Sequence, residues 1–311
     1  MIGLIGFGSI GERHYTNLIA AGEKVVVFSA RKDLKKISVV NDWLAFKKQG
    51  PFEAVFICNE TAKHLTTLRK VMVLKPRAIF VEKPLSHSSA GLNILIKELQ
   101  KKNISLWVGY NMQFLRPLIY IKKIIVSKKL GKILYVRAAV GQDLREWRKR
   151  DYKKIYSAKK KSGGGVLLDL VHDLNYPAWL LGESLLPKAA LVRKSSSLSI
   201  DVEDSADSLL MTKSDTIVSV HQDYCRVPGK RTLEIQGEKG SVEWDSVSNL
   251  VIISTKDKRR EEKFVVEHNE MYSAEITFFL KQLRGSRYFS NAKEAVVDIM
   301  NIEKIKKYGQ K

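Results

Sequence analysis

Short apolar runs alternate with helix-like segments through the first third of the chain. Apolar residues recur at helical spacing over residues 11–21, 61–74 and 88–102. Between these segments lie short runs rich in β-branched residues, at positions 2–5, 25–28, 54–58, 78–81 and 104–108. Continuous apolar runs of this length are typical of strands that are buried on both faces. The alternation therefore predicts an α/β fold with a doubly wound parallel sheet.

The first apolar run leads directly into a glycine-rich segment, Gly6-Phe7-Gly8-Ser9-Ile10-Gly11. The first glycine permits a tight turn, the second lets the backbone approach a pyrophosphate, and the third lets the next helix pack on the strand. The N-terminus of that helix offers N–H groups and a positive dipole to phosphates. A purely structural turn is the alternative, but the flanking strand and helix favour a dinucleotide site, and we count all six residues as cofactor contacts.

The end of the second strand bears on which dinucleotide binds. Folds that bind NAD usually place Asp or Glu there, whereas this chain has Ser29 and Arg31. A carboxylate would repel a ribose 2′-phosphate, while a hydroxyl and a guanidinium would bind it. The sequence therefore predicts NADP, with NAD as the less favoured cofactor. The alternative is that Arg31 and Lys32 are ordinary surface cations.

Polar residues also follow the next two apolar strands, at the edge of the sheet where such folds bind ligands. Asn59, Glu60 and His64 follow one strand, and the segment Glu82-Lys83-Pro84 ends the other. Pro84 restricts Lys83 to an extended conformation and so directs it. These five polar residues are candidate cofactor contacts. The structural alternatives are a turn at Asn59 and an ion pair between Glu82 and Lys83.

The pattern changes after residue 117. Strand-like segments then follow one another with turns between them, at 132–140, 188–197, 205–212, 216–223, 232–236, 241–244 and 250–254. Consecutive strands without intervening helices predict an antiparallel meander. We therefore divide the chain into domains 1–117 and 118–311. The last helical stretch, 292–307, is a candidate to pack back on the first domain.

Composition is that of a soluble globular protein, with 44% hydrophobic and 28% charged residues among 311. No apolar run is long enough to span a membrane. The net charge of +21 comes from lysines spread along the chain without a nucleic-acid motif, so we expect anionic small molecules rather than nucleic acid as partners. Cys58 and Cys225 are too few for a disulfide framework or a metal site, which favours the reducing cytoplasm and no metal cofactor.

Five segments carry a resemblance to a known family. They are GFGSIGERH at 6–14, CNETAKH at 58–64, EKP at 82–84, GYNMQF at 109–114 and GGGVLLDLVHDLNY at 163–176. In this order and spacing the chain resembles the Gfo/Idh/MocA oxidoreductases over nearly its whole length. The similarity is closest to members of bacterial surface-polysaccharide and nonulosonic-acid sugar pathways, and this narrower likeness rests on the stretch from Trp147 to the glycine triplet at 163–165.

The resemblance implies an N-terminal Rossmann domain that binds NAD(P), followed by an α/β domain whose large, mostly antiparallel open sheet carries the substrate pocket. It implies a homo-oligomer, dimer or tetramer, formed through that sheet. Lys83 matches the lysine that contacts the nicotinamide ribose and the reacting hydroxyl, while Asp169 and His172 match the paired acid and base. Weaker candidates for substrate contacts are Asn111, Arg148, Tyr152, Tyr156, Asp173 and Asn175.

The chemistry of these residue types agrees with those roles. Oxidation of an alcohol needs a hydride acceptor and a base, and imidazole exchanges protons near neutral pH. Asp169 and His172 are three residues apart, so one helix would place both on the same face. The carboxylate would then orient the imidazole, while Lys83 would stabilise a developing alkoxide. The structural alternative is that Asp169 caps a helix and His172 makes a core hydrogen bond.

Two positions depart from the family pattern. Many relatives space the acid and the histidine four apart, and the fourth place here is Asp173. Gln113 stands where relatives often have arginine. The other histidines, His14 among them, are interpreted as bystanders.

The sequence thus predicts an NAD(P)-dependent dehydrogenase or reductase acting on a CH–OH group. It would move a hydride between nicotinamide C4 and a ring carbon of a sugar, amino sugar or nucleotide sugar. The alternative is a cofactor-sensing regulatory protein on the same fold, which would have no need to retain Lys83, Asp169 and His172.

Overall fold

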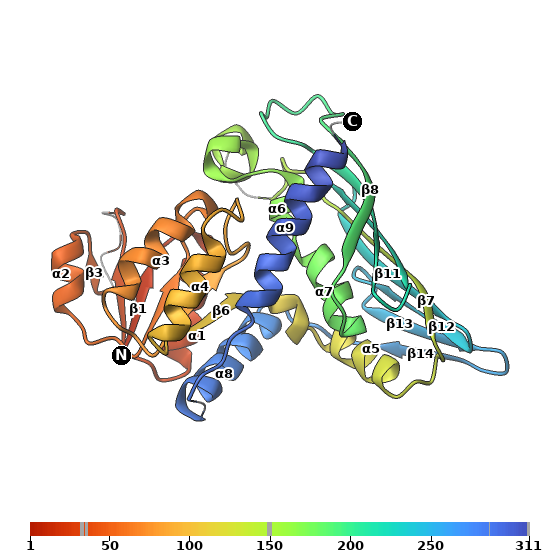
Figure 1. The fold of residues 1–311 in the computed structure, drawn as a ribbon, viewed down its shortest axis with the longest axis horizontal. Coiled ribbons are helices and arrows are strands. Elements are labelled where there is room, and N and C mark those ends of the chain that lie inside the picture. Colours follow the sequence, from red (N-terminus) through yellow and green to blue (C-terminus); the bar gives the residue numbers. More distant parts are fainter. Residues whose placement is uncertain (32–33, 35–36, 148–150, 286, 310–311) are drawn as a thin grey trace. The chain divides into compact units, whose positions relative to one another are not determined.

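The computed structural model describes every residue except 32–33, 35–36, 148–150, 286 and 310–311 (Figure 1). Its described residues form two compact units. Unit 1 contains Met1–Tyr110 and Tyr272–Ile299, and unit 2 contains Asn111–Met271 and Met300–Lys311. The chain thus returns to unit 1 late in the sequence, in a segment that the predicted domains 1–117 and 118–311 assign to the second domain.

Unit 1 is built on a parallel sheet with the strand order β3-β2-β1-β4-β5-β6. The strands are β1 (Ile2–Ile5), β2 (Val25–Phe28), β3 (Val39–Val40), β4 (Ala54–Ile57), β5 (Ala78–Glu82) and β6 (Ser105–Gly109). All neighbouring pairs are parallel, which confirms the doubly wound sheet that the alternation predicted. The two-residue strand β3 was not predicted.

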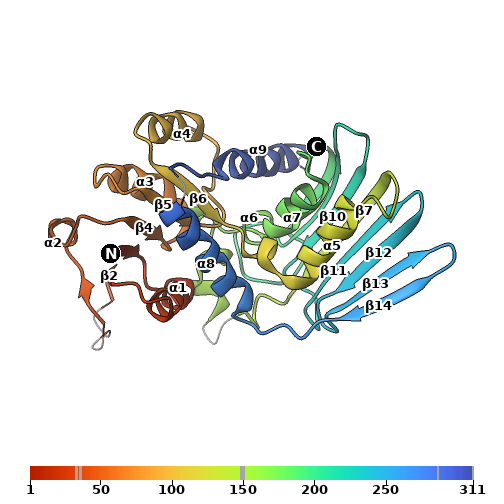
Figure 2. The same cartoon turned by 90° about the horizontal axis from the view of Figure 1, so that it is seen from below.

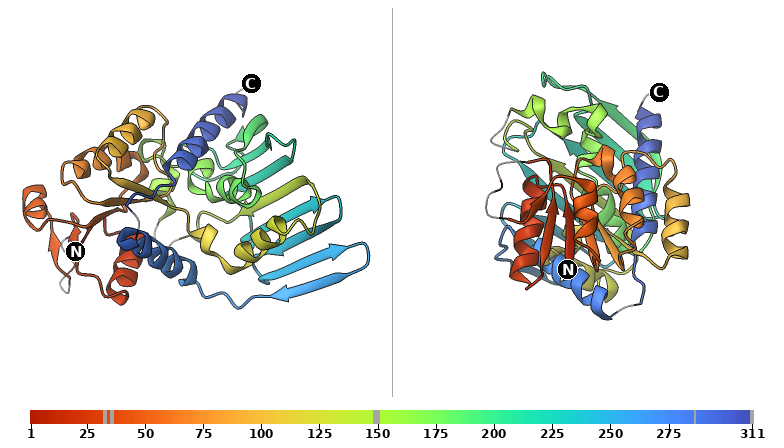
Figure 3. Two further views of the ribbon diagram at one scale, coloured as in Figure 1. Left: turned by 60° about the horizontal axis from the view of Figure 1, so that its bottom comes forward. Right: turned by 90° about the vertical axis from the view of Figure 1, so that its left-hand side faces the viewer.

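Helices cover both faces of this sheet (Figure 3). On one face α1 (Ser9–Ala20) and α8 (Glu270–Gly285) pack on a core that includes Phe56 and Phe80, whose rings stack 4.5 Å apart. On the other face lie α3 (His64–Met72), preceded by the 3₁₀ turn η1 (Thr61–Lys63), and α4 (Leu92–Lys101). The short helix α2 (Trp43–Lys48) closes the β3 end of the sheet.

Unit 2 is built on a sheet with the strand order β14-β13-β12-β11-β7-β10-β9-β8. Its strands are β7 (Ile133–Gly141), β8 (Leu186–Arg193), β9 (Ser205–Met211), β10 (Ile217–Asp223), β11 (Lys230–Gly237), β12 (Gly240–Asp245), β13 (Leu250–Thr255) and β14 (Arg259–Lys263). Most pairs are antiparallel, as predicted. The simple meander is wrong at the centre, because β10 pairs with β7 in parallel.

One face of this sheet is covered by α5 (Arg116–Val126) and α7 (His172–Leu181), with the short α6 (Val166–Asp169) beside them (Figure 2). The 3₁₀ turns are η2 (Asn111–Phe114), η3 (Tyr152–Lys154), η4 (Tyr156–Ala158) and η5 (Lys160–Ser162). The last helix, α9 (Ala292–Gly309), begins in unit 1 and ends in unit 2, where Asn301 donates a hydrogen bond to the Leu185 carbonyl at 2.9 Å. No helix in the described part of the chain is long and apolar enough to cross a membrane.

Candidate active site

Close packing within the chain explains two of the three glycines in the turn of unit 1. Gly6 has φ +93°, and a Cβ there would lie 2.7 Å from the backbone nitrogen of Asn59. A Cβ at Gly11 would lie 2.1 Å from the carbonyl oxygen of Gly6. By contrast, apart from Gly8 and its neighbours in the chain, no heavy atom among the described residues lies within 4 Å of the place where a Cβ of Gly8 would stand. The fold needs the outer two glycines, whereas the middle one leaves open space for a ligand to reach the backbone.

This open space lies at the N-terminus of a helix. Gly8 is the N-cap of α1 and has no side chain to bond the first-turn N–H groups. Those groups and the helix dipole suit a phosphate. Ser9 is exposed and Ile10 half-buried, while the Phe7 ring is buried and packs edge-on against Tyr15 with centroids 5.5 Å apart. The turn therefore offers mainly backbone to a dinucleotide, and its donors fit a pyrophosphate.

Ser29 and Arg31 lie beside the same turn. Arg31 Nη1 donates to the carbonyl oxygen of Phe7 at 3.1 Å, which brings the guanidinium over the glycine segment. Ser29 Oγ accepts from the backbone N–H of Arg31 at 3.2 Å. The cationic group is thus held where the ribose of a dinucleotide would follow its pyrophosphate. Lys32 lies outside the described residues.

At the end of β4 the candidate residues are bound to the chain itself. Asn59 Nδ2 donates to Thr67 Oγ1 at 2.8 Å, and the exposed Glu60 pairs with Lys63 at 2.8 Å. His64 is buried between two carbonyl oxygens, with Nε2 3.0 Å from that of Asn59 and Nδ1 2.9 Å from that of Pro84. Burial lowers the pKa of His64, and these hydrogen bonds oppose that effect.

Glu82 ends β5 and is buried with a partner that the sequence did not reveal. Its Oε1 lies 2.5 Å from Nε2 of His14, which is fully buried on α1. His14 is therefore no bystander, because it bonds the last residue of β5, directly before Lys83. The signal for it was present in the spacing, because Gly11, His14 and Leu18 form one buried stripe of α1.

Helix α8 adds a second buried carboxyl group to this part of unit 1. Glu275 Oε1 accepts from Trp107 Nε1 at 3.3 Å. Burial raises the pKa of Glu275 well above its ordinary value, and the charge of Glu82 raises it further. Sequence reasoning missed this residue because it did not predict α8.

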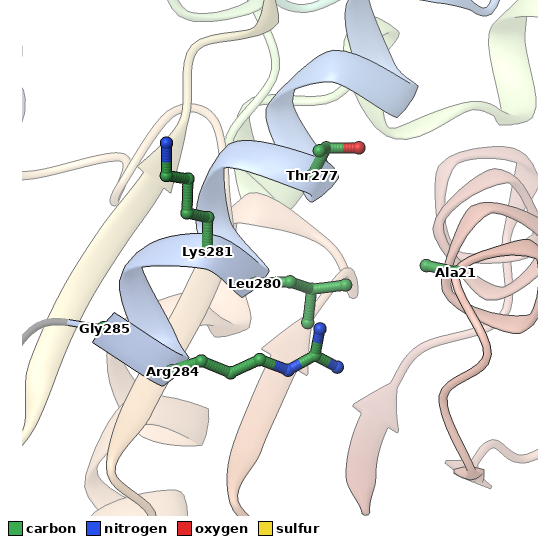
Figure 4. Close-up of a pocket in the computed structure, with 6 residues that line it drawn as sticks. All are labelled: Ala21, Thr277, Leu280, Lys281, Arg284 and Gly285. Atoms are coloured by element: carbon green, nitrogen blue, oxygen red, sulfur yellow. The ribbon is translucent and has the colours of Figure 1, made fainter.

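A separate hollow of about 570 Å³ lies between the end of α1 and the C-terminal half of α8 (Figure 4). It is lined by Ala21, Thr277, Leu280, Lys281, Arg284 and Gly285. Since α1 starts at the glycine turn, its last residues lie at the opposite edge of the sheet. The hollow is therefore not the nucleotide site.

In unit 2 the glycine triplet permits a close backbone contact. A Cβ at Gly164 would lie 2.4 Å from the carbonyl oxygens of both Tyr156 and Ser157. Gly165 has φ +115°, which L-residues with side chains rarely adopt. The triplet therefore fixes the start of α6 against η4, and α6 carries Asp169 at its end.

Asp169 and His172 lie on either side of a break between two helices, so the prediction that one helix places both on a single face is wrong. Helix α6 ends at Asp169 and α7 begins at His172. Gln222 on β10 holds the break by donating to the Leu170 carbonyl at 2.8 Å. Both site residues are buried, with 2% and 8% of their surfaces exposed.

Asp169 is bound by a tyrosine from the loop after β10. Tyr224 OH donates to Asp169 Oδ2 at 2.7 Å. Burial raises the pKa of Tyr224 well above its ordinary value, and the charge of Asp169 adds to that rise. Tyr224 thus remains a donor and holds the carboxylate at its position next to the helix break.

Asp173 and Asn175, two of the weaker candidates, are held by other side chains. Arg231 on β11 binds the fully buried Asp173 with two hydrogen bonds, from Nε at 2.8 Å and from Nη2 at 3.0 Å. Asn175 Oδ1 accepts from Gln113 Nε2 at 2.9 Å. The glutamine that replaces the usual arginine therefore bridges η2 to α7.

The remaining weaker candidates differ in their surroundings. Asn111 is buried at the start of η2, and Tyr156 is half-buried in η4 beside the glycine triplet. The hydroxyl of Tyr152 accepts from the backbone N–H of Ser199 at 3.2 Å. Arg148 lies outside the described residues.

Two family profiles together match most of the chain. Residues 1–110 match the "oxidoreductase family, NAD-binding Rossmann fold" and residues 118–243 match the "GFO/IDH/MocA C-terminal domain". The chain belongs to the Gfo/Idh/MocA family of oxidoreductases.

Curated relatives of this oxidoreductase share about a quarter of its residues. Myo-inositol 2-dehydrogenase of Thermotoga maritima is 24% identical over 307 residues, covering 91% of this chain and 88% of the relative. A partial match, 27% identical over 104 residues, links 33% of this chain to 27% of the 2,7-anhydro-N-acetylneuraminate hydratase of Mediterraneibacter gnavus.

The fold is also that of solved structures. Levoglucosan dehydrogenase in complex with NADH and levoglucosan matches with a TM-score of 0.88 at 18% identity, covering 99% of this chain and 96% of that one. The Rossmann sheet and the mostly antiparallel second sheet of the oxidoreductase are therefore confirmed. Among the residues that the structure describes, no three His, Cys, Asp or Glu side chains gather in a way that could hold a metal ion.

Proposed function

We propose that this oxidoreductase moves a hydride between nicotinamide C4 and a ring carbon of a sugar, amino sugar or nucleotide sugar. The observation that carries the proposal is the buried Asp169, held by Tyr224 at 2.7 Å, with His172 directly across the helix break. A buried carboxylate and a buried imidazole three residues apart are the groups that an acid–base step on an alcohol requires. The likeness to dehydrogenases of inositol and levoglucosan supports an alcohol of this class.

Each proposed residue has a distinct task. The nicotinamide, when bound, accepts or supplies the hydride. His172 takes the hydroxyl proton during oxidation and returns it during reduction, while Asp169 stabilises the charged imidazole. Lys83 places a positive charge near the oxygen as it develops alkoxide character. In unit 2 the proposed substrate contacts are Asn111, Tyr156, Asp173 and Asn175.

The proposed cofactor is NADP. The support is the guanidinium of Arg31, which is bonded over the glycine turn, together with the hydroxyl of Ser29 in place of the usual carboxylate. The side chains of Glu60 and Asn59 lie at the neighbouring strand end for the remaining contacts.

The activity is tested with a panel of polyols, sugars and nucleotide sugars, by following the absorbance of the reduced nicotinamide. Lys83→Met and His172→Ala should each lower turnover by about 10²- to 10⁴-fold, as expected for the loss of a group that moves or stabilises a proton. His87→Ala, at an exposed histidine, is the control and should behave as wild type. Wild-type rates in either site variant would overturn the assignment. Cofactor binding without turnover on any substrate would instead favour the sensor.

The cofactor is tested by calorimetric titration with NADPH and NADH. NADPH should bind more tightly, and Arg31→Ala should remove much of the difference. Arg77→Ala is the matched control, because Arg77 pairs with Glu53 at the far edge of the sheet. Equal affinities in the wild type would end the preference for NADP and leave the fold untouched.

We further propose that the enzyme is a dimer or tetramer formed through the open face of the unit 2 sheet. On β8, β9 and β10 this face carries Leu191, Leu209 and Ile217, which are diagonal neighbours in the strand register and are 61%, 43% and 50% exposed. Apolar side chains gathered on one face gain stability when a second copy covers them. Leu209→Glu should shift the mass measured by light scattering toward the monomer, and a monomeric wild type would contradict the proposal.

The proposed compartment is the reducing cytoplasm. Both cysteines are free thiols, Cys58 buried and Cys225 exposed. An exposed free thiol is typical of proteins that are kept in reducing surroundings.

A further inference from the structure

Two buried histidines bind the residues on either side of Lys83. His14 bonds the side chain of Glu82, which precedes the lysine, with Nε2 and Oε1 2.5 Å apart. His64 bonds the backbone of Pro84, which follows it, with Nδ1 2.9 Å from the carbonyl oxygen. Both histidines are at least 99% buried, and they come from different helices, α1 and α3.

Each ring is itself firmly placed. His14 packs against the rings of Phe56 and Phe80, with centroids 5.8 and 5.0 Å away, in the core of unit 1. Close packing of this kind allows little rotation of the imidazole. The second ring nitrogen of His14, Nδ1, is buried without a hydrogen-bond partner among the described residues, so the ring is fixed by packing and by its bond to Glu82. His64 Nε2 lies 3.0 Å from the Asn59 carbonyl oxygen, so the ring lies between the end of β4 and the segment after β5 and can donate its N–H to one of the two carbonyls.

We propose that His14 and His64 are positioning residues that together hold the Glu82-Lys83-Pro84 segment so that the lysine amino group is presented at the strand edge. The catalytic consequence rests on the role proposed above for Lys83. His64, predicted from the sequence to touch the cofactor, acts in this proposal through the backbone of its neighbours.

The physical reason is the length of the lysine side chain. Four methylene groups give it many rotamers, so a mobile backbone at Lys83 would spread the amino group over a large volume. A displacement of about 1 Å at a reacting group can cost about 100-fold in rate. Fixing the residues before and after the lysine removes the backbone contribution to that spread. If the two histidines had only a structural role, replacing them would lower the stability of unit 1 without changing the position or reactivity of Lys83.

The test compares His14→Leu and His64→Leu with the conservative variants His14→Gln and His64→Gln, which keep an N–H donor. His87→Gln, in the loop that follows Pro84, is the exposed control. Two measurements use the protein without substrate: amide hydrogen exchange of the peptide spanning 79–90, and the rate at which an amine-reactive reagent modifies Lys83. Two more measure cofactor affinity and the separate values of kcat and KM.

In the leucine variants, exchange and labelling at the segment should quicken by about 10- to 100-fold, the range expected when a hydrogen bond to a charged or buried group is lost. kcat should fall by a similar factor while cofactor affinity changes by less than about threefold. The variant His14→Gln should restore most of the wild-type protection of the segment and most of the wild-type kcat. Unchanged exchange at the segment, or a loss of kcat that only follows a loss of cofactor binding, would overturn the proposal.

Two further outcomes are also decisive. If the leucine variants do not fold, Glu82→Gln takes their place, because it removes the charge that His14 bonds with little change in size and should also quicken exchange and labelling of the segment. If Lys83→Met is as active as the wild type while exchange and labelling still change, the histidines do hold the segment and the role of Lys83 in catalysis is wrong. The two proposals therefore fail in different experiments.

Discussion

The glycine turn of unit 1 and the acid–imidazole segment of unit 2 are built in opposite ways. Around Gly6 and Gly11 the close contacts are with backbone atoms of the turn itself and of the neighbouring strand end. At the helix break, by contrast, side chains more than 50 residues away bond the chain: Tyr224 bonds Asp169 and Gln222 bonds the Leu170 carbonyl. A site formed by backbone atoms can be predicted from the glycines in the sequence. A site formed by side chains that are distant in the sequence leaves no such local pattern. The following variants test that difference.

The largest effect is expected at Arg231, whose partner Asp173 is fully buried. Arg231→Leu leaves an uncompensated buried charge and should lower the free energy of unfolding by about 3–5 kcal/mol, measured by urea denaturation. Asp173→Asn in the same chain should restore part of the loss. The matched control is Arg137→Leu at the exposed pair with Glu234, where a change of about 0–1 kcal/mol is expected. Equal losses at the two pairs would show that the unit 2 site does not depend on its buried contacts.

Next come two alanine substitutions in the glycine turn. Gly11→Ala places a Cβ 2.1 Å from a backbone oxygen and should cost about 1–3 kcal/mol or more, because neither backbone can move aside freely. Gly8→Ala meets no atom of the described chain within 4 Å, so it should leave stability near wild type and weaken dinucleotide binding. Thermal unfolding and calorimetric titration measure the two effects. If Gly8→Ala bound the cofactor as well as wild type, the open space would have no role in binding.

A smaller effect is expected at Tyr224. Tyr224→Phe removes the hydroxyl that bonds Asp169 and should cost about 1–3 kcal/mol, since a buried carboxylate loses a donor. The control is Tyr135→Phe, which removes a comparable bond to Glu234 on the sheet surface and should cost less. Turnover should fall only in the first variant. If both variants lost turnover, the bond between Tyr224 and Asp169 would not be the cause of the loss.

The smallest effect concerns pH and a histidine outside the site. Hydrogen bonds to Asp223 and Asp207 raise the pKa of His221 to about 9 from its ordinary value of 6.5. Because the folded-state pKa is raised, the stabilisation is complete below about pH 6.5 and is lost as the pH rises through about 9. Unfolding free energies across this window should decline in the wild type and decline less in His221→Gln. The partial exposure of the pair keeps the effect small. Parallel pH profiles would contradict the assigned shift.

Most secondary structure could be predicted because its cause is local. The β-branched runs and their turns located nearly all the strands, and the glycine spacing located the turn before α1. Strand β14 was missed because Arg259–Lys263 is charged throughout and forms a strand only by pairing with β13. Helix α8 was missed although it buries Ile276 and Phe279. These residues pack on the sheet of unit 1, whose strands lie more than 150 residues earlier in the sequence.

The candidate site shows the same limit. Lys83, Asp169 and His172 were identified because motifs carry them. Tyr224 and Arg231 were not, because each has a role only through a partner that is distant in the sequence. The spacing on α1 could have shown that His14 is buried, but not that its partner is Glu82. The parallel pairing of β7 with β10 was likewise invisible, since register between strands far apart in sequence depends on the whole sheet.

The sequence by itself determined the alternation that makes a Rossmann sheet, the strand-rich second part and the backbone turn of the dinucleotide site. These depend on the conformational preferences of each residue and its immediate neighbours, which are present in the unfolded chain. Only the tertiary structure decided which buried side chains hold Glu82, Asp169 and Asp173. Charged groups are stable in the interior only when a specific partner binds them. These partners are distant in the sequence and come into contact only when the chain folds.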